Sequence, residues 1–205
     1  MARGKFVVFE GGEGSGKTTM VERLKEQFPE LVIAQDPGGT PLGQYVREYV
    51  LSDRSAGIDA RAELLLFLAA RAELIEKIIK PALAAGMNVI GNRFSLSSIA
   101  YQVYGRQRPD LLSLVQSITA EITKDCMPDA TILLDVTPEK GVERVHSRPE
   151  EPTRFDKENL EFHSRVREGF KKHAADFGKV FVVDADRPLE KVWQEVHETV
   201  LTIFS

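Results

Sequence analysis

Apolar residues follow two alternating patterns along the chain. Short apolar runs lie at about residues 5–10, 31–34, 88–91, 130–136 and 180–183, and such runs predict strands buried on both faces of a parallel sheet. Between them, apolar residues recur every three or four positions and predict helices at about residues 16–28, 42–51, 59–85, 95–104, 111–123, 155–177 and 188–204. This alternation predicts an α/β fold in which a five-stranded parallel sheet is flanked by helices and joined by right-handed crossovers.

Four residues mark where the expected helices begin, bend or end. Pro81 lies inside the pattern of residues 59–85, and because proline lacks a backbone N–H we expect a kink or break just before it. Gly86 is predicted to end that helix, since glycine tolerates the left-handed conformation of the C′ position. Ser95 is a predicted N-terminal cap, and Pro138 is predicted to open a short helix at its first position.

The composition limits the class of protein. With 205 residues, 42% of them hydrophobic, the chain is expected to form one domain over residues 1–205. A net charge of −4 disfavours a nucleic-acid partner and predicts that any anion is bound by a local basic cluster. The single cysteine, Cys126, excludes an internal disulfide and fits a cytoplasmic, reducing compartment. No apolar run approaches the ~20 residues that cross a bilayer, so we expect no membrane association.

A glycine-rich segment lies between the first predicted strand and the first predicted helix. Its glycines, followed by Lys17 and Thr18, fit the phosphate-binding loop (P-loop), in which backbone N–H groups surround phosphates and the threonine hydroxyl binds magnesium. A dinucleotide-binding fingerprint is excluded, because Lys17 stands where its third glycine would fall. The predicted phosphate-binding residues are Gly11, Gly12, Glu13, Gly14, Ser15, Gly16, Lys17, Thr18 and Thr19.

Arginines follow the third and fourth predicted strands. Arg93 comes just after the third strand, where open α/β sheets place their ligands. A polar segment at about residues 146–155 contains Arg148 and Arg154, with Arg144 before it, and is a candidate lid. Phosphoryl transfer requires positive charge around the migrating group more than covalent chemistry. The residues alone therefore predict a nucleotide-dependent kinase that acts on a small phosphorylated substrate.

Six segments carry a resemblance to a known family. They read GGEGSGKTT (11–19), DPGGT (36–40), LLFLAARAELIE (65–76), NRFSLSSIAYQ (92–102), PDATILLDVTPEKGVER (128–144) and VDADRPLEKV (183–192). From residue 6 to its end, the chain resembles bacterial-type thymidylate kinases. The resemblance implies a three-layer P-loop nucleoside monophosphate kinase fold and transfer of the γ-phosphate of ATP to dTMP, which gives dTDP. It also implies Mg²⁺ as cofactor and a homodimer, for which the apolar segment 64–83 is a candidate surface.

The resemblance assigns roles on the ATP side of the site. Lys17 and Glu13 match catalytic P-loop positions, and Glu13 is expected near the sugar 3′-hydroxyl and, with Thr18, near the metal. The loop has Ser15 and no arginine, so the chain looks like the type with lid arginines, for which Arg148 and Arg154 are the candidates. Arg144 matches a residue that packs against adenine.

The resemblance also assigns the dTMP side. Phe67 matches the aromatic residue that stacks on thymine, Arg71 lies beside it, and Arg93 matches the catalytic arginine that binds the dTMP phosphate. Ser98 and Tyr101 match positions that face the thymine and deoxyribose. For three further residues the sequence leaves two readings open, substrate contact or ordinary packing and solvation: Arg47, Ser97 and Gln102.

The chain departs from the family pattern at two places. Asn92 stands where the family has aspartate, and Gln35-Asp36 replaces Arg-Glu.

Three alternative functions are weighed beside dTMP kinase. A GTP-binding switch lacks its N-K-x-D motif here, and a kinase of thymidine or another deoxynucleoside would give Arg93 no phosphate to bind. A non-catalytic nucleotide-binding homologue would account for Asn92.

Overall fold

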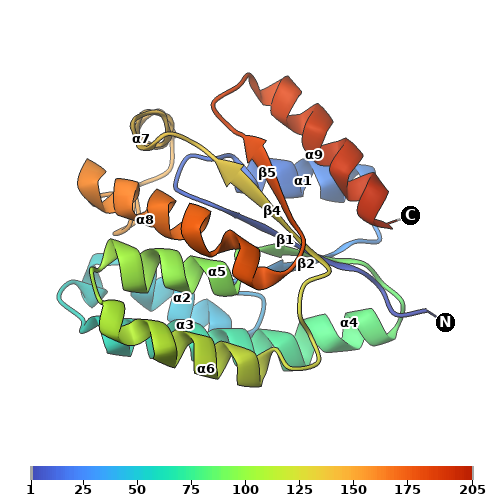
Figure 1. The fold of residues 1–205 in the computed structure, drawn as a ribbon, viewed down its shortest axis with the longest axis horizontal. Helices are drawn as coiled ribbons and strands as arrows, with labels where there is room; N and C mark the ends of the chain where they lie inside the picture. Colours follow the sequence, from blue (N-terminus) through green and yellow to red (C-terminus); the bar gives the residue numbers. More distant parts are fainter. Residues whose placement is uncertain (1, 205) are drawn as a thin grey trace.

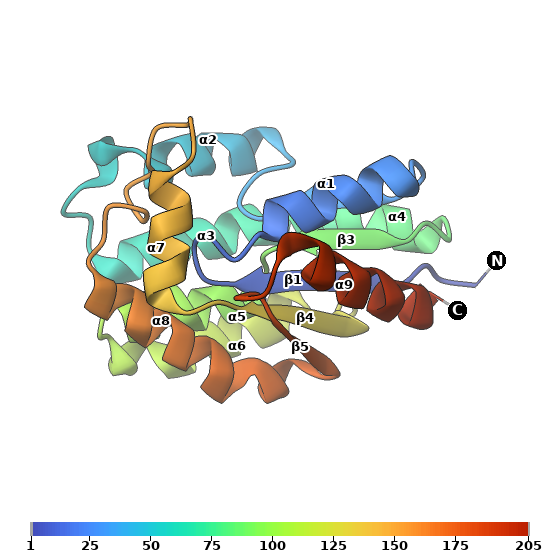
Figure 2. The same cartoon turned by 90° about the horizontal axis from the view of Figure 1, so that it is seen from above.

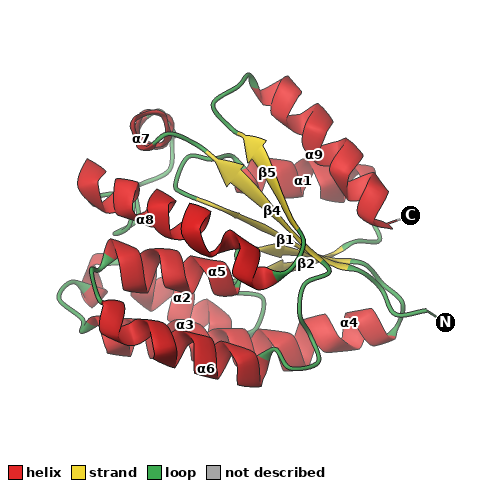
Figure 3. Cartoon of the chain, in the orientation of Figure 1, coloured by secondary structure: helices red, strands yellow, loops and turns green. Residues whose placement is uncertain are grey.

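The computed structural model describes residues 2–204, and its centre is a five-stranded parallel sheet. The strands are β1 (Phe6–Gly11), β2 (Val32–Gln35), β3 (Val89–Asn92), β4 (Ala130–Asp135) and β5 (Val180–Asp184). Their order across the sheet is β2-β3-β1-β4-β5, so β1 is central, with Phe9 opposite Asn92 of β3 and Gly11 opposite Leu134 of β4. The predicted α/β class and the number of strands are confirmed, and Figure 3 shows helices on both sides of the sheet.

Helices cover both faces of the sheet (Figure 1). On one face, α1 (Lys17–Gln27) and α9 (Leu189–Phe204) pack against Val7 and Phe9 of β1. On the other face, Phe6 and Val8 face a core with residues of α3 (Ala60–Leu74) and α4 (Lys80–Ala84). Successive side chains of a strand point to opposite faces, so the apolar run at residues 6–9 supplies both cores.

A second apolar cluster joins the remaining helices of that face. It contains residues of α3, of α6 (Leu112–Ile122) and of α8 (Leu160–His173). Two further helices, α2 (Pro41–Leu51) and α7 (Pro138–His146), lie toward the carboxyl ends of the strands. Figure 2 shows the chain after α7 reaching toward α2, where the Arg154 backbone N–H donates to the Leu51 carbonyl at 3.0 Å.

The predicted helix at residues 59–85 is interrupted, as Pro81 indicated. The α-helix ends at Leu74, a π-helical turn spans Ile75–Ile79, and α4 follows. Because Pro81 cannot donate to the preceding turn, the wider π turn accommodates the missing hydrogen bond before the helix resumes. Gly86 has φ 80° and lies one residue past the C-cap, and Pro138 is at the start of α7, both as predicted.

Two helix starts were predicted wrongly. Ser95 does not cap α5 (Ser95–Ser98), because the buried carboxylate of Glu10 accepts hydrogen bonds from the N–H groups of Phe94 and Ser97 and takes the place of a cap. The helix predicted to begin at residue 155 begins at Leu160, where the Asn159 side chain caps it by accepting from the Phe162 N–H.

Two findings bear on the compartment and membrane expectations. Cys126 is a free, buried thiol. Within residues 2–204, none of the helices combines the length and apolar character that a bilayer crossing requires.

Candidate active site

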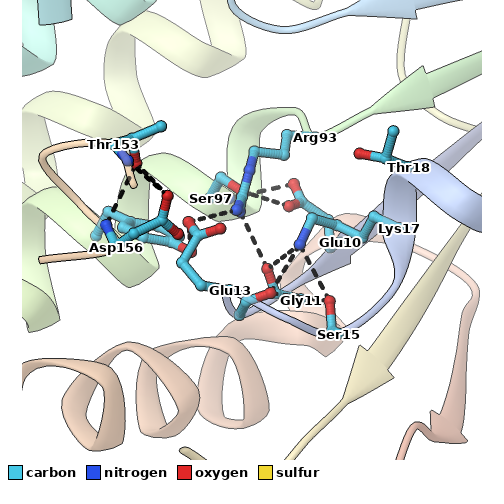
Figure 4. Close-up of polar contacts among 12 residues, drawn as sticks. Glu10, Gly11, Glu13, Ser15, Lys17, Thr18, Arg93, Ser97, Thr153 and Asp156 are labelled. Carbon is cyan, nitrogen blue, oxygen red and sulfur yellow. Dashed lines mark hydrogen bonds and ion pairs between the residues drawn. The ribbon is translucent and has the colours of Figure 1, made fainter. Parts of the chain in front are cut away.

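The P-loop between β1 and α1 surrounds the ammonium group of Lys17. Lys17 Nζ donates to the carbonyls of Gly11 and Gly12 at 2.9 and 2.8 Å and to Ser15 Oγ at 3.0 Å (Figure 4). Burial, together with the charge of Arg93, lowers the pKa of Lys17 to about 7. The lysine is therefore held at the loop by oxygen atoms of the loop itself.

Two glycines allow the loop to pack on neighbouring backbone. At Gly14 (φ 69°) a Cβ atom would lie 2.2 Å from the carbonyl oxygen of Gly141 in α7, and at Gly11 (φ 147°) one would lie 2.5 Å from that of Leu134. Both φ values belong to conformations that glycine adopts without steric cost. A side chain at either position would push the loop away from β4 or α7.

Arg93, Glu13 and Tyr101 form the centre of the site. Arg93 Nη2 donates to Glu13 Oε1 at 2.7 Å, the Tyr101 hydroxyl donates to the same oxygen at 2.8 Å, and the guanidinium carbon lies 4.9 Å from the centroid of the Tyr101 ring. Burial disfavours the Glu13 carboxylate, but the charges of Arg93 and Lys17 outweigh it and lower its pKa to about 2. Glu13 is therefore ionised at neutral pH and forms an ion pair with Arg93.

Glu10 is a site residue that the pattern analysis did not select. Besides the two backbone N–H groups after β3, it accepts a hydrogen bond from Ser97 Oγ at 2.5 Å, and it is 1% exposed. These contacts hold the turn at which Arg93 adopts a left-handed backbone conformation, with φ 69°, which is uncommon for a residue with a side chain. The available signal was a carboxylate inside an otherwise apolar strand.

Asn92 connects the P-loop helix to β2. Its amide nitrogen donates to Gln35 Oε1 at 3.0 Å and lies 3.5 Å from the hydroxyl oxygen of Thr18. The two departures from the family pattern are thus in contact with each other, and the pair lies at the residue expected to bind magnesium.

The residues present fit a magnesium ion that is held mainly by phosphates and water. Within residues 2–204, no group of three or more acidic, histidine or cysteine side chains could form a protein metal cage. Mg²⁺ in phosphoryl-transfer sites usually takes only one or two protein oxygen ligands. Both predicted oxygen donors, the Thr18 hydroxyl and the Glu13 carboxylate, line the same cavity.

That cavity has a volume of about 460 Å³ and extends from the P-loop to the lid. Residues 13–19 of the P-loop line it, whereas Gly11 and Gly12 do not. All the residues predicted to bind dTMP also line it: Arg47, Phe67, Arg71, Arg93, Ser97, Ser98, Tyr101 and Gln102. The structure therefore brings together side chains from α2, α3, the end of β3 and the helix after it.

Arg71 forms a buried ion pair with Asp36 at the edge of this cavity. Burial raises the pKa of Asp36, and the charge of Arg71 opposes that rise. Arg71 Nη1, Asp36 Oδ1 and Ser98 Oγ have no hydrogen-bond partner within residues 2–204. Buried polar atoms of this kind are expected to have a partner, so they are candidate contacts for a polar ligand.

The two lid arginines have different surroundings. Arg148 is exposed and lines the large cavity, together with Glu150 and Thr153. Arg154 is not among the cavity residues, because its guanidinium pairs with Glu63 and donates to the Val50 carbonyl. The structure thus places one of the two predicted arginines at the site and the other in a buried ion pair beside it.

A second cavity of about 280 Å³ also borders the P-loop. Its walls include Arg144, whose Nη1 donates to the Gly14 and Ala185 carbonyls at 3.3 and 2.9 Å, and residues Arg187 and Leu189. Arg148 and the P-loop residues Gly14, Ser15, Gly16 and Thr19 line both cavities. The two cavities therefore meet at the P-loop and the lid.

Comparisons with known proteins agree with this geometry. The family model described as thymidylate kinase matches residues 9–196. A thymidylate kinase of Marinomonas sp. is 41% identical over 201 residues, covering 96% of this chain and 93% of the relative. One of Deinococcus radiodurans is 40% identical over 201 residues, covering 96% of each chain, and one of Halothermothrix orenii is 39% identical over 204 residues, covering 97% of each. With the P-loop, the large cavity and these relatives taken together, the chain belongs to the thymidylate kinase family.

Proposed function

We propose that this protein transfers the γ-phosphate of ATP to dTMP and produces dTDP. The observation that carries the proposal is the meeting of two cavities at one P-loop: the larger is lined by Phe67, Arg71 and Arg93, and the smaller by Arg144 and Arg187. A transfer between two nucleotides requires two sites whose phosphate ends face one another across the phosphate-binding loop. Arg148 lines both cavities, which supports a proposed role for it at the migrating group.

The residues of the large cavity are proposed to act as follows. Lys17 and Arg148 stabilise the charge of the transferred phosphoryl group, and Arg93 binds the phosphate of dTMP. Phe67 stacks on the thymine ring, with Arg71 and Gln102 at the edge of the base. Glu13 holds Arg93 in place by the ion pair at 2.7 Å and accepts a hydrogen bond from the sugar hydroxyl.

The ATP side is proposed to use Arg144 and the loop at residues 184–187 as walls of the adenine site. Thr18, with Glu13 nearby, would hold Mg²⁺, which supplies positive charge to the phosphates when it is bound. The backbone N–H groups of residues 13–19 then surround the phosphates at the N-terminus of α1.

The larger assembly is part of the proposal. We expect a homodimer, and three exposed side chains on neighbouring helices offer an apolar surface: Leu42 and Tyr45 of α2 and Leu65 of α3, which are 44%, 72% and 45% exposed. Within the segment 64–83, Leu65 is the large apolar side chain that is exposed, so it is the segment's main contribution. We expect a cytoplasmic protein without a nucleic-acid or membrane partner. A monomer peak in light scattering at micromolar concentration would contradict the dimer.

Isothermal titration with dTMP and with thymidine, followed by a coupled assay for ADP, tests the function. The account predicts binding of dTMP, much weaker binding of thymidine and ADP formation that depends on dTMP. Preference for thymidine would indicate a nucleoside kinase, and binding without ADP formation would indicate a non-catalytic homologue. Either result would refute the proposal.

A further inference from the structure

Glu63 is a buried carboxylate that none of the roles above uses. It lies in α3 four residues before Phe67 and eight before Arg71, and residues at this spacing share one face of a helix. The residue is 1% exposed, and burying a charge of this kind is costly unless it is paired. If Glu63 is ionised, its neighbours must therefore stabilise the negative charge.

All three side chains that contact the Glu63 carboxylate donate hydrogen bonds to it. Gln102 Nε2 donates to Oε1 at 3.0 Å, Arg106 donates from Nε to Oε1 and from Nη2 to Oε2 at 3.2 Å each, and Arg154 Nη2 donates to Oε2. Burial alone would raise the pKa of Glu63, but these partners lower it. Glu63 is thus held ionised, as an acceptor only.

The contact with Glu63 fixes the orientation of the Gln102 amide. A carboxylate only accepts hydrogen bonds, so the amide must turn its NH₂ group toward Glu63. Within residues 2–204 no protein group donates to Gln102 Oε1, and Gln102 lines the large cavity. The carbonyl oxygen is therefore the part of the amide that remains for a ligand.

We propose that Glu63 is a positioning residue that keeps the Gln102 carbonyl directed into the large cavity. In this way it selects a nucleotide whose base has an N–H group at N3. The proposal rests on the proposed function, since it concerns the base of the acceptor nucleotide. Thymine and uracil both present an N3–H donor, whereas N3 of cytosine is an acceptor. The Gln102 carbonyl held in this orientation accepts a hydrogen bond from N3–H of thymine or uracil. It offers no donor to N3 of cytosine.

The isosteric variant Glu63→Gln tests the orientation directly. Of the three side chains that hydrogen-bond to Glu63 within residues 2–204, the two arginines only donate. Gln102 is therefore the side-chain partner that can accept from the new NH₂ group, and it does so by turning its own carbonyl toward residue 63. The NH₂ group of Gln102 then faces the cavity. We expect the ratio of kcat/KM for dTMP to that for dCMP to fall about tenfold, as for loss of one buried hydrogen bond.

Three controls separate orientation from stability. Glu63→Asp keeps an acceptor-only group and should keep the dTMP to dCMP ratio within about threefold. Arg106→Met removes an ion pair of Glu63 but not the Gln102 contact, so it should lower the melting temperature without changing the ratio. The ratio of dTMP to dUMP should stay constant in all variants, because both bases carry N3–H. A ratio of dTMP to dCMP that is unchanged in Glu63→Gln, or that falls equally in Arg106→Met, would overturn the proposal.

A readout without substrate keeps this test independent of the proposed function. The side-chain amide protons of Gln102, assigned in ¹⁵N-edited NMR spectra by their loss in Gln102→Leu, should exchange slowly in the wild-type protein and shift in Glu63→Gln. Fast exchange in the wild-type protein, or identical signals in a folded Glu63→Gln protein, would refute the role of Glu63 even if dTMP is not the acceptor. Failure of the wild-type protein to phosphorylate dTMP, with these signals as expected, would instead refute only the proposed function.

Discussion

The side-chain amide of Asn92 donates a hydrogen bond to Gln35 Oε1 over 3.0 Å, with the hydroxyl oxygen of Thr18 at 3.5 Å from the same nitrogen. Neither residue of this pair is the one that the family pattern leads us to expect. Both are neutral, so the pair satisfies its own hydrogen bond and adds no charge to the proposed magnesium position. Two departures that looked independent in the sequence therefore form a single contact.

The first prediction concerns this pair. Asn92→Asp adds a negative charge without a change of size, and Gln35 can turn its amide to donate to it. We expect activity to saturate at a lower magnesium concentration, with turnover preserved or raised. Turnover measured against magnesium concentration for both proteins checks this. Lower activity near neutral pH would show that a neighbouring carboxylate, such as Glu10 or Asp36, already supplies the charge, and an unchanged curve would place residue 92 outside the reach of the metal.

Lys17 should take up a proton when ATP binds. Its pKa is about 7, so at pH 8 most molecules carry a neutral Lys17, and the negative phosphates raise the pKa and favour the charged form. The binding enthalpy measured by titration calorimetry at pH 8 should therefore differ between Tris and HEPES buffers in the direction of proton uptake. Below about pH 6 the uptake should vanish, because Lys17 is already protonated. Equal enthalpies in the two buffers at pH 8 would contradict the lowered pKa.

Lys17→Ala should nearly abolish phosphoryl transfer and leave the fold intact. The ammonium group is proposed to interact with charge that develops on the transferred group, so its loss acts on turnover. Steady-state kinetics and a circular dichroism spectrum check the two parts. If Lys17→Ala kept activity within a few-fold of the wild-type protein, the assignment of residues 11–19 as the phosphate-binding loop would be wrong.

Arg93→Ala should weaken the binding of dTMP far more than the binding of ATP. Loss of a charge-assisted contact with a phosphate typically costs about 1.5–3 kcal/mol, roughly a ten- to hundred-fold change in affinity. Titration of each nucleotide measures both affinities, and Arg108→Ala, which breaks an exposed pair with Asp110, serves as a control that should change neither. If the variant lost affinity for ATP and kept its affinity for dTMP, the two sites would be assigned the wrong way round.

The lid arginines should separate in their effects. Arg148 lines both cavities, so Arg148→Ala should lower kcat more than it changes either KM. Arg154 pairs with Glu63, so Arg154→Ala should lower the melting temperature and reduce kcat less than Arg148→Ala does. Glu151→Ala, at an exposed position of the same lid that does not line either cavity, is the control for disturbing the segment. If Arg148→Ala changed only the KM for ATP, the lid would bind substrate and would have no catalytic role.

The sequence predicted the parts of the fold that depend on local pattern. The unbroken apolar run at residues 6–9 predicted a strand buried on both faces, and Pro81 and Gly86 predicted the break and the end of one helix, because each effect arises from the residue itself. The start of α8 was missed because Thr153 and Asp156 form a turn of their own, in which the Thr153 N–H donates to the Asp156 carboxylate at 2.8 Å. The spacing of apolar residues does not predict that contact.

The sequence named candidate site residues one by one, but it did not predict the contacts among them. Glu13 and Arg93 are 80 positions apart in the chain, and the short pairing between them follows from strand order, which periodicity does not encode. Glu10 and Glu63 were missed for a related reason. Each is a carboxylate that serves other side chains from a buried position, and only the tertiary structure shows which donors surround it.

Transfer of label from [γ-³²P]ATP is the most direct test of the account. After incubation with dTMP and magnesium, separation of the nucleotides should show labelled dTDP in the wild-type protein, none in Lys17→Ala, and little labelled product when thymidine replaces dTMP. Label that appears only in inorganic phosphate, or preferentially in a product of thymidine, would contradict the claim that this protein phosphorylates dTMP.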